Sequence, residues 1–396
     1  MRAWSKSYGE LHPPKRLLLG GGPSNIDSRI LKALTLPIVG HLDPYFSEIM
    51  NETVELLRYA FKTNNRITLP ISGTGTAGME AAICNIVERG EEVITCINGF
   101  FGERISDIVQ RNGGKCITVK GEWGKVISKE EVKEALSNSD AEVVAIVHAE
   151  TSTGVLQPLK EIKKIIDEYD ALLLVDAVTS LGGCELDVDG LGIDVCYSAA
   201  QKCLNCPPGL APITVSEKAM EKIRNRKTKV QSWYLDLSLI EKYWLESNRV
   251  YHHTAPILLV YALREALRLL YEEGLEARWE RHRRNSLALI SGIAALGLEM
   301  HPKEYRCPVL NAVSIPEGIQ DINVRRTLVN EFDITVSGGL GALKGKVWRI
   351  GLMGINSTKR NVILFLKALE RALNKEGYPV KLGEGVSSAM NKFAGQ

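Results

Sequence analysis

The chain has 396 residues, which is enough for two domains with a large core. Hydrophobic residues make up 45% and charged residues 24% of the sequence, and 49 basic and 47 acidic side chains leave a net charge of +2. This composition gives no electrostatic reason to expect a nucleic-acid or membrane-surface partner, and no run of about 18 apolar residues predicts a membrane-spanning helix.

The N-terminal half alternates between strand-like and helix-like segments. A polar arm over residues 1–16 leads into the apolar Leu17–Leu19 and the turn-rich Gly20–Asn25. Beyond them, apolar strands that alternate with amphipathic helices predict an α/β fold, with a mostly parallel sheet covered on both faces. The predicted strands are Ile67–Pro70, Val93–Ile97, Lys115–Val119, Val143–His148, Leu172–Asp176, Val195–Ser198 and Ala211–Val215. The predicted helices are Ala77–Glu88, Phe101–Arg111, Lys129–Leu136 and Leu159–Tyr169.

The C-terminal part predicts a smaller α/β domain. Residues 257–290 carry leucines at helical spacing, which predicts one long helix or a broken pair that leads into this domain. We expect an N-terminal arm over residues 1–19, a large domain over 20–272 and a small domain over 273–396. The predicted elements of the small domain are the strands Val309–Ile315 and Lys346–Leu352 and the helices Val324–Glu331 and Lys359–Lys375.

Lys202 has an unusual sequence context. It follows an apolar strand and the small residues Ser198–Ala200, and the rigid Pro207–Gly209 comes shortly after it. Most lysines are solvated surface charges. A lysine that is partly desolvated at a strand end has a lowered pKa instead, so it can form an imine and act as a general base. We therefore single out Lys202 as a catalytic candidate.

Asp176 ends the apolar strand Leu172–Asp176. In an α/β sheet, ligands bind at the carboxyl ends of the strands. A carboxylate in that place can keep a pyridinium nitrogen protonated. The alternative is an N-cap for a following helix, which is a common role of aspartate. We favour the ligand role because Lys202 follows one strand further along the chain.

The segment Gly73–Gly78 contains GxGxxG after a strand and at the start of a helix. Its backbone N–H groups and the hydroxyls of Thr74 and Thr76 suit a phosphate. A dinucleotide site would need an acid at the end of the next strand, where the sequence has Asn98. It would also normally lie on the first strand of its unit, whereas the helix-like Asp43–Lys62 intervenes after the arm. The sequence therefore favours a phosphate monoester.

Three further features have competing interpretations. Arg349 lies in the apolar strand VWRIG, where an unpaired charge is costly, so a ligand or a buried acid must compensate it. The adjacent His252 and His253 lack an accompanying carboxylate pattern, and we favour packing over metal binding. The CxxC of Cys203 and Cys206 has no second ligand pair, so we expect loop packing rather than zinc or redox chemistry. No metal site is predicted.

Eight motifs in this order resemble the class V aminotransferases of pyridoxal 5′-phosphate (PLP) fold type I, and within them the alanine–glyoxylate / serine–pyruvate aminotransferase group. The resemblance runs from about Leu17 to Leu373. It implies a large domain with a mostly parallel sheet, a smaller C-terminal α/β domain, and a homodimer with shared active sites. The motifs are LLLGGGPSN, ISGTGTAGMEAA, NGFFGER, HAETSTGVLQPL, LLLVDAVTSLGG, SAAQKCLNCPPGL, YHHTAP and GKVWRIGLMG.

The resemblance also implies roles for individual residues. Lys202 matches the lysine that holds PLP as a Schiff base and moves the substrate proton, and Asp176 matches the acid paired with the pyridine nitrogen. Arg349 matches the arginine that binds the substrate α-carboxylate, for which a planar guanidinium is suited. Gly22 and Asn25 join it at the expected substrate site. The matched cofactor-binding residues are Thr74, Gly75, Thr76, Phe101, Thr151 and Gln201, with Tyr251 and Thr254 reaching the phosphate from the neighbouring subunit.

Three positions depart from the family pattern. Phe101 stands where a tryptophan usually stacks on the cofactor ring, and stacking survives with a smaller apolar face. Thr76 stands where histidine is frequent, and it keeps a donor. The run before Gln201 is Ser-Ala-Ala instead of Ser-Gly-Ser, which removes one hydroxyl. These changes keep the chemistry, but they loosen any transfer of substrate preference.

The resemblance implies transamination between serine or alanine and glyoxylate or pyruvate. The alternatives are another PLP activity, such as 2-aminoethylphosphonate transaminase or cysteine desulfurase, and a PLP-binding protein without catalysis. A desulfurase needs a mobile catalytic cysteine, whereas the candidates here lie in predicted strands or beside Lys202. The cytoplasm is the expected location, because the start shows no apolar leader and the end no targeting tripeptide.

Overall fold

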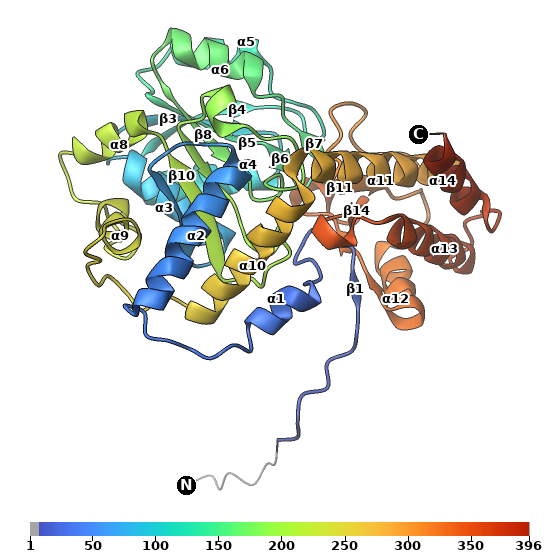
Figure 1. The fold of residues 1–396 in the computed structure, drawn as a ribbon. Coiled ribbons are helices and arrows are strands. Elements are labelled where there is room, and N and C mark those ends of the chain that lie inside the picture. The colour runs from blue at the N-terminus through green and yellow to red at the C-terminus, as the bar shows by residue number, and fades with distance from the viewer. Residues whose placement is uncertain (1–7, 396) are drawn as a thin grey trace, which may run out of the picture.

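Seven strands form the central sheet of the computed structural model, which describes residues 8–395 (Figure 1). Their order is β2-β10-β9-β8-β5-β3-β4, and only β10 runs against the others. The strands are β2 Ile67–Ser72, β3 Glu92–Ile97, β4 Lys115–Lys120, β5 Val143–Val147, β8 Leu172–Asp176, β9 Val195–Tyr197 and β10 Leu210–Val215. The seven predicted strands and the mostly parallel sheet are thus confirmed.

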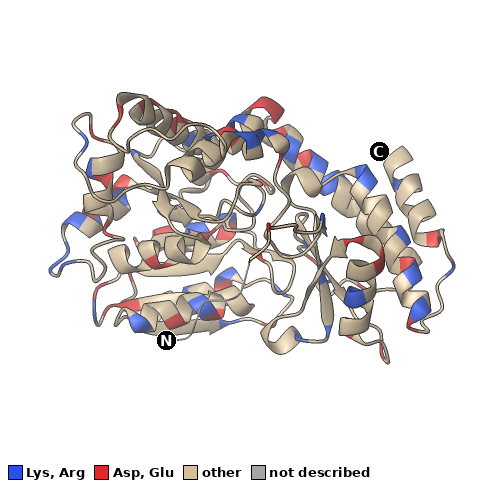
Figure 2. Cartoon of the chain, turned by 90° about the horizontal axis from the view of Figure 1, so that it is seen from below, with Lys and Arg blue, Asp and Glu red and all other residues tan. Residues whose placement is uncertain are grey.

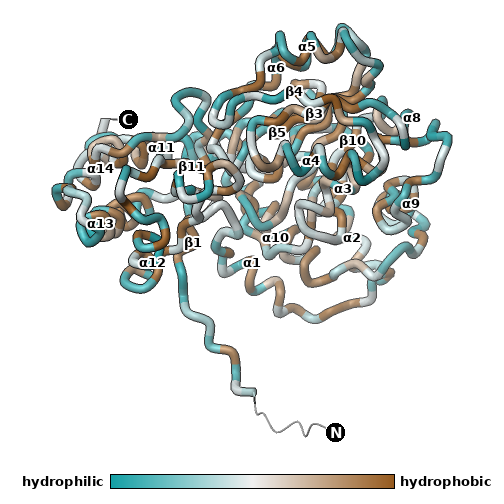
Figure 3. The backbone as a smooth tube through the Cα atoms, turned by 180° about the vertical axis from the view of Figure 1, so that it is seen from behind, coloured by the Kyte–Doolittle hydropathy of each residue, from teal (hydrophilic) through white to brown (hydrophobic). Residues whose placement is uncertain are grey.

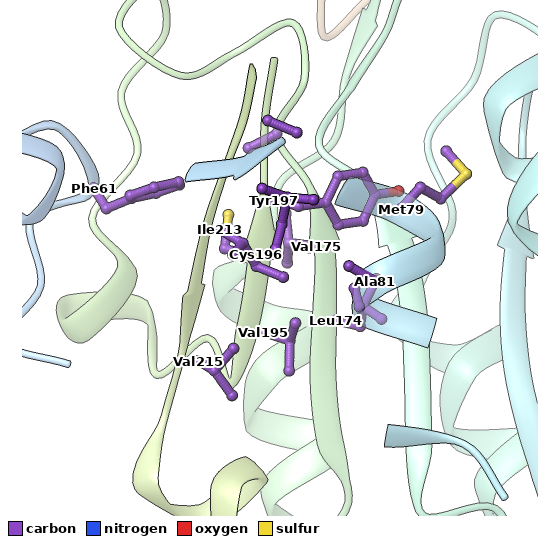
Figure 4. Packing of buried hydrophobic residues seen from close by; sticks show 14 of the residues in the cluster. Phe61, Met79, Ala81, Leu174, Val175, Val195, Cys196, Tyr197, Ile213 and Val215 are labelled. Carbon is purple, nitrogen blue, oxygen red and sulfur yellow. The ribbon is translucent and has the colours of Figure 1, made fainter. Parts of the chain in front are cut away.

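Helices cover both faces of this sheet. Figure 4 shows Phe61 of α2 on one side of the strands and Met79 of α3 on the other. Helix α3 approaches closely because Gly78 has no side chain: a Cβ there would lie 2.9 Å from the Cβ of Ala211. The helices of this part are α1 Ser28–Ala33, α2 Pro44–Phe61, α3 Gly75–Ile86, α4 Phe100–Arg111, α5 Lys129–Ser137, α6 Lys160–Glu168, α7 Val188–Leu191, α8 Glu217–Arg224 and α9 Leu237–Trp244.

Local sequence signals explain where two of these helices begin. Asp43 caps α2 by accepting the N–H of Tyr45 at 2.8 Å, and Pro44 occupies the first helical position. Ser128 and Glu131 form a capping box at the start of α5. Helices α1 and α7 were not predicted because six and four residues are too few to establish a helical period.

The C-terminal part forms a second core around β14 (Val347–Gly351), which lies between β11 (Leu310–Ser314) and β13 (Ser337–Gly338) in an antiparallel sheet. The long helical stretch is a broken pair, because Gly274 separates its two helices with a φ of 82°. Helix α10 Ile257–Glu273 packs in the first core, and α11 Leu275–Ala295 runs from the first core into the second. The other elements of the C-terminal part are α12 Asp321–Phe332, β12 Ile334–Thr335, α13 Lys359–Lys375, α14 Glu384–Ala394 and the short 3₁₀ helices η1 Gly341–Leu343 and η2 Gly354–Asn356.

The segment before Gly20 is anchored to the C-terminal core. Strand β1 (Leu17–Leu18) pairs in parallel with β12, and Leu19 is buried among the side chains of this core. Residues 1–7 of the expected arm lie outside the described part of the chain. The domain boundaries stay a prediction, although the change from one large buried cluster to the other falls inside α11, between Leu275 and Ala288.

Charged side chains of both signs are interspersed along the outer helices (Figure 2). This arrangement agrees with the near-zero balance of the sequence, in which 49 basic residues face 47 acidic ones. Among residues 8–395, no helix is long and apolar enough to cross a membrane.

Asn205 connects segments of both cores. Its Nδ2 donates to the hydroxyl of Ser24 at 2.9 Å and to the carbonyls of Asn25 and Met353 at 3.1 and 3.2 Å. Its Oδ1 accepts the N–H of Ile355 at 2.8 Å. Asn205 is buried and has a φ of 55°, a conformation in which asparagine is favoured over most residues. The loop after β9 is thereby tied to the turn after β1 and to the loop that precedes α13.

We expect Asn205→Ala to lower the free energy of unfolding by about 2–4 kcal/mol, because several buried partners lose their hydrogen bonds at once. Urea unfolding of the PLP-free protein measures this loss. Asn138→Ala is the matched control: Asn138 is exposed at the end of α5, and its replacement should change the same quantity by less than about 0.5 kcal/mol. Equal losses for the two variants would contradict the connecting role of Asn205.

Candidate functional site

The candidate residues meet at one edge of the central sheet. Strand β5 leads into the short hairpin β6 (Ala149–Glu150) and β7 (Val155–Leu156), β8 ends at Asp176, and β9 is followed by Lys202. Strand β2 leads into α3 at the same edge. Because these strands run in the same direction, their carboxyl ends form one ligand-binding edge.

Lys202 lies against the glycine turn that follows β1. Its Nζ donates a hydrogen bond to the carbonyl of Gly21. Gly22 has a φ of 102°, and a Cβ there would lie 2.7 Å from Nζ, so only glycine leaves the amine this space. The Lys202 side chain as a whole is half-buried, but its amine lies directly against the Gly21 carbonyl and the backbone of Gly22. Burial lowers the pKa of Lys202 to about 8, and the positive charge of Arg349 lowers it further. The lowered pKa that we expected from the sequence is present.

Asp176 is 3% exposed at the end of β8. Its Oδ2 accepts the hydroxyl of Tyr197 at 2.9 Å, and its Oδ1 accepts the N–H of Val178 at 2.8 Å. Burial raises the pKa of Asp176 to about 6, while these hydrogen bonds and the charge of Lys202 limit the rise. The N-cap alternative is wrong, because turns follow Asp176 and the next helix begins only at Val188.

The loop after β2 presents the start of α3. Thr74 is the N-cap residue, and its side chain makes no capping hydrogen bond within the helix. Gly75 allows close packing, since a Cβ there would lie 2.9 Å from the Cβ of Ala199. The hydroxyl of Thr76 accepts a hydrogen bond from Arg104 at 3.3 Å. This helix start, with its free N–H groups and an adjacent cation, can hold an anion.

The sheet topology excludes the dinucleotide interpretation of this loop. Strand β2 lies at the edge of the sheet and is bonded only to the antiparallel β10. The next strand, β3, lies near the opposite edge. The strand, loop and helix are therefore not part of the parallel βαβ unit that binds dinucleotides.

Arg104 is a site residue that we did not identify from the sequence. Its guanidinium lies over the rings of Phe100 and Phe101, at 5.2 and 4.8 Å from their centroids. Its positive charge opposes the rise in the pKa of Asp176 and adds to the lowering of the pKa of Lys202. The signal was its place in NGFFGER, one helical turn after Phe101 and on the same face of α4.

Arg349 is 8% exposed in the middle of β14. Its Nε donates to the carbonyl of Gly338 at 2.8 Å, and its Nη1 donates to that of Thr151 at 3.3 Å. Burial lowers its pKa, and the negative charge of Glu150 opposes this shift. Within residues 8–395 no ion pair joins Arg349 to Glu150, so much of the charge stays available to a ligand. Gly21 keeps this space open, because a Cβ there would lie 2.9 Å from Nη1.

Two further predicted residues flank the turn and the lysine. The side-chain oxygen of Gln201 is buried without a hydrogen-bond partner among the described residues. Both ends of the Asn25 side chain are engaged: Oδ1 accepts the N–H of Leu18 at 2.8 Å, and Nδ2 donates to the carbonyl of Arg16 at 2.8 Å. Gln201 therefore has hydrogen-bonding capacity to offer a ligand, whereas Asn25 holds the turn in place.

Tyr251 and Thr254 lie on the surface, where Tyr251 is 56% exposed. The histidines between them pack against neighbouring side chains: His252 stacks on Trp233 at 4.3 Å. His253 shares a hydrogen bond of 2.7 Å with the hydroxyl of Ser72. Over residues 8–395, no group of histidine, cysteine, aspartate or glutamate side chains could hold a metal ion.

These features suit a planar, phosphate-bearing pyridine ring. Lys202 offers an amine with a lowered pKa, and Asp176 offers a buried carboxylate for a ring nitrogen. The start of α3 and Arg104 together offer an anion site. Gln201, whose side-chain oxygen has no partner among the described residues, directly precedes Lys202 in the sequence. The residues present therefore fit PLP.

Comparison with known proteins agrees with this fit. The family model described as Aminotransferase class-V matches residues 32–365. The crystal structure of an alanine–glyoxylate aminotransferase from Nostoc sp. is 49% identical, with a TM-score of 0.92 over 94% of this chain and 98% of its own. That of the ureidoglycine–glyoxylate aminotransferase from Bacillus subtilis is 40% identical, with a TM-score of 0.95 over 98% of this chain and 100% of its own. The alanine–glyoxylate aminotransferase of Callithrix jacchus is 42% identical over 91% of this chain and 88% of its own. The chain therefore belongs to the class V aminotransferases, PLP-dependent enzymes of fold type I, as its motifs predicted.

Proposed function

We propose that this enzyme transfers an amino group from alanine or serine to glyoxylate or pyruvate, with PLP attached to Lys202. The observation that carries the proposal is the meeting, at one strand edge, of the Lys202 amine, the Asp176 carboxylate and the Arg349 guanidinium. The names of the relatives support glyoxylate as the acceptor, since both kinds of relative are named for it. Ureidoglycine is a second candidate donor, because the Bacillus subtilis relative is named for it.

Bound PLP supplies an electron-withdrawing ring that acidifies the Cα–H bond of the amino acid. Lys202 takes this proton and returns it, a role for which a pKa of about 8 is suited because the neutral amine is accessible near neutral pH. Asp176 would pair with the ring nitrogen of bound PLP, and its negative charge would favour the protonated form of that nitrogen. The hydrogen bonds from Tyr197 and Val178 favour the ionised form of this carboxylate, so they oppose the effect of burial.

Arg349 binds the carboxylate of the amino acid and of the oxoacid in turn, since both substrates carry this group. Gly22 leaves the substrate room beside Lys202, and Asn25 contributes by holding the glycine turn. Phe101 would stack on the ring of bound PLP. The remaining residues that we propose for PLP binding are Thr74, Gly75, Thr76, Thr151 and Gln201.

We propose that the enzyme is a homodimer in the cytoplasm, and that Tyr251 and Thr254 reach the PLP phosphate of the neighbouring subunit. Both residues are exposed, and large apolar side chains are exposed around them, which is typical of an interaction surface. The segment between α1 and α2 is rich in hydrophobic residues, as its colours in Figure 3 show. The ring centroid of its His41 lies 5.1 Å from that of Tyr251. The exposed apolar residues are Leu36, Ile38, Leu42, Tyr45, Trp233, Tyr234 and Val250.

The cysteines argue against the desulfurase alternative. Cys116 is half-buried and the other seven are buried, so no cysteine lies on an exposed loop of the described chain. The 2-aminoethylphosphonate alternative has no supporting observation among the described residues. The non-catalytic alternative is disfavoured because Lys202 and Asp176 are both in place at the strand edge, and burial lowers the pKa of Lys202 to about 8.

The PLP-loaded protein should absorb violet light, and L-alanine or L-serine should shift this band to shorter wavelength until glyoxylate restores it. A panel of donors against glyoxylate and pyruvate, followed by absorbance, identifies the substrates. Lys202→Ala should lower turnover by at least about 10²–10⁴-fold, because the proton then has no carrier. Lys229→Ala, at an exposed lysine, should leave turnover unchanged. A protein that PLP does not colour would contradict the proposal.

PLP uptake by the PLP-free enzyme should accelerate as pH rises through about 8, because only the neutral Lys202 amine attacks the cofactor aldehyde. Below this pH most of the amine is protonated, and above it the rate should level off. Stopped-flow absorbance between about pH 6.5 and 10 measures the profile. A midpoint near the ordinary lysine pKa of about 10.4 would show that the amine is not desolvated.

Mixed dimers test the shared active site. Lys202→Ala and the double variant Tyr251→Ala, Thr254→Ala should each be nearly inactive at limiting PLP. When the two are unfolded and refolded together, half of the dimers contain one chain of each kind, and one of their two sites is intact. Activity should then recover to about a quarter of the wild-type value. If Tyr251 and Thr254 served their own subunit, mixing would restore nothing.

A further inference from the structure

Glu150 is a buried carboxylate for which the proposed reaction has no use. It lies in β6 at the ligand-binding edge of the sheet and is 0% exposed. Burial raises its pKa, and the hydrogen bonds that it accepts oppose this rise. Since an acid in such a place is costly unless it is bonded, its partners indicate what it does.

Both carboxylate oxygens of Glu150 are engaged at the start of α4. Oε2 accepts the N–H of Phe101 at 3.0 Å, and Oε1 accepts the N–H and the hydroxyl of Ser152 at 2.9 and 2.7 Å. The Ser152 oxygen in turn accepts the N–H of Phe100 at 3.0 Å. The first N–H groups of a helix have no partner within the helix. Glu150 and Ser152 supply these partners from another segment of the chain.

The N-cap residue of α4 cannot do this itself, because it is Gly99. Glycine is required there: a Cβ on Gly99 would overlap the side chain of Glu150. A negative charge at a helix N-terminus also stabilises the helix, because it interacts with the positive end of the helix dipole. The start of α4 is therefore fixed to the sheet edge through a buried carboxylate.

This anchoring fixes Phe101 in particular. Its backbone N–H is held by Glu150, while the guanidinium of Arg104 lies over its ring at 4.8 Å. A phenyl ring offers less stacking area than the indole that is usual in the family. A small displacement of Phe101 should therefore remove a larger fraction of the stacking contact with PLP than the same displacement of a tryptophan would.

We propose that Glu150 is a positioning residue that holds Phe101 in place against the PLP ring. This inference rests on the proposed stacking role of Phe101, and Glu150 acts without touching PLP or substrate. Glu150 also influences Arg349 through space. That second effect predicts a different phenotype, a changed KM for the amino acid, so the two can be separated.

Glu150→Gln keeps the shape of the side chain but removes its negative charge. It also replaces one carboxylate oxygen by an NH₂ group, which cannot accept the hydrogen bonds from Phe101 or Ser152. Titration of the PLP-free enzyme with PLP, followed by absorbance and by the circular dichroism that bound PLP acquires, should show affinity weakened by about tenfold. In a Phe101→Ala background the backbone N–H that Glu150 accepts remains, but the ring that it positions is gone, so the same change should weaken affinity by less than about twofold. Glu103→Gln, at an exposed acid in the first turn of α4, is the control.

Equal weakening in both backgrounds would overturn the proposal and indicate a general structural role. Unchanged PLP affinity with an altered KM for L-alanine at saturating PLP would overturn it in favour of a role at Arg349. If Glu150→Gln fails to fold, Ser152→Ala replaces it, with an expected weakening of about threefold that again depends on Phe101. Wild-type enzyme that binds no PLP would instead reject the proposed function itself.

Discussion

The close packing of the glycine turn against Lys202 is the constraint on which the rest of the site depends. The carbonyl of Gly21 accepts a hydrogen bond from Nζ, and the hydroxyl of Ser24 holds the backbone carbonyl of Lys202 at 2.8 Å. The C-terminal core holds this glycine turn in place, because β1 pairs with β12 and Leu19 is buried in that core. Lys202 thus lies between the two cores. The desolvation that lowers its pKa depends on the pairing of β1 with β12, which holds the glycine turn against the amine.

Burial disfavours the charged form of all three ionisable groups of the site. It lowers the pKa of Lys202 to about 8 and raises that of Asp176 to about 6, so at neutral pH the amine is close to releasing its proton while most of the carboxylate stays ionised. Arg349 keeps a charge that its backbone partners do not neutralise. Buried charged groups lower the stability of the PLP-free protein. The phosphate and ring nitrogen of PLP and the carboxylate of the substrate would offset this cost by pairing with them.

The sequence predicted the central strands because each is a short run of apolar residues. It predicted Asp176 because this residue ends such a strand, and Lys202 because it follows the next one. It could not predict the strand order, or that β10 runs against its neighbours, since residue periodicity carries no pairing information. Arg104 and Glu150 were missed for a related reason. Their partners come from segments far apart in the chain, and only the packing of α4 on the sheet edge brings them together. Short elements such as β1 escape any periodic pattern.

The attachment point of PLP can be identified directly on the protein. Borohydride reduction of the PLP-loaded enzyme turns the bond between cofactor and lysine into a stable amine, and digestion followed by mass spectrometry locates the pyridoxyl group. We expect one labelled peptide per chain, with the label on Lys202. A label on another lysine, or no labelled peptide from fully loaded enzyme, would contradict it.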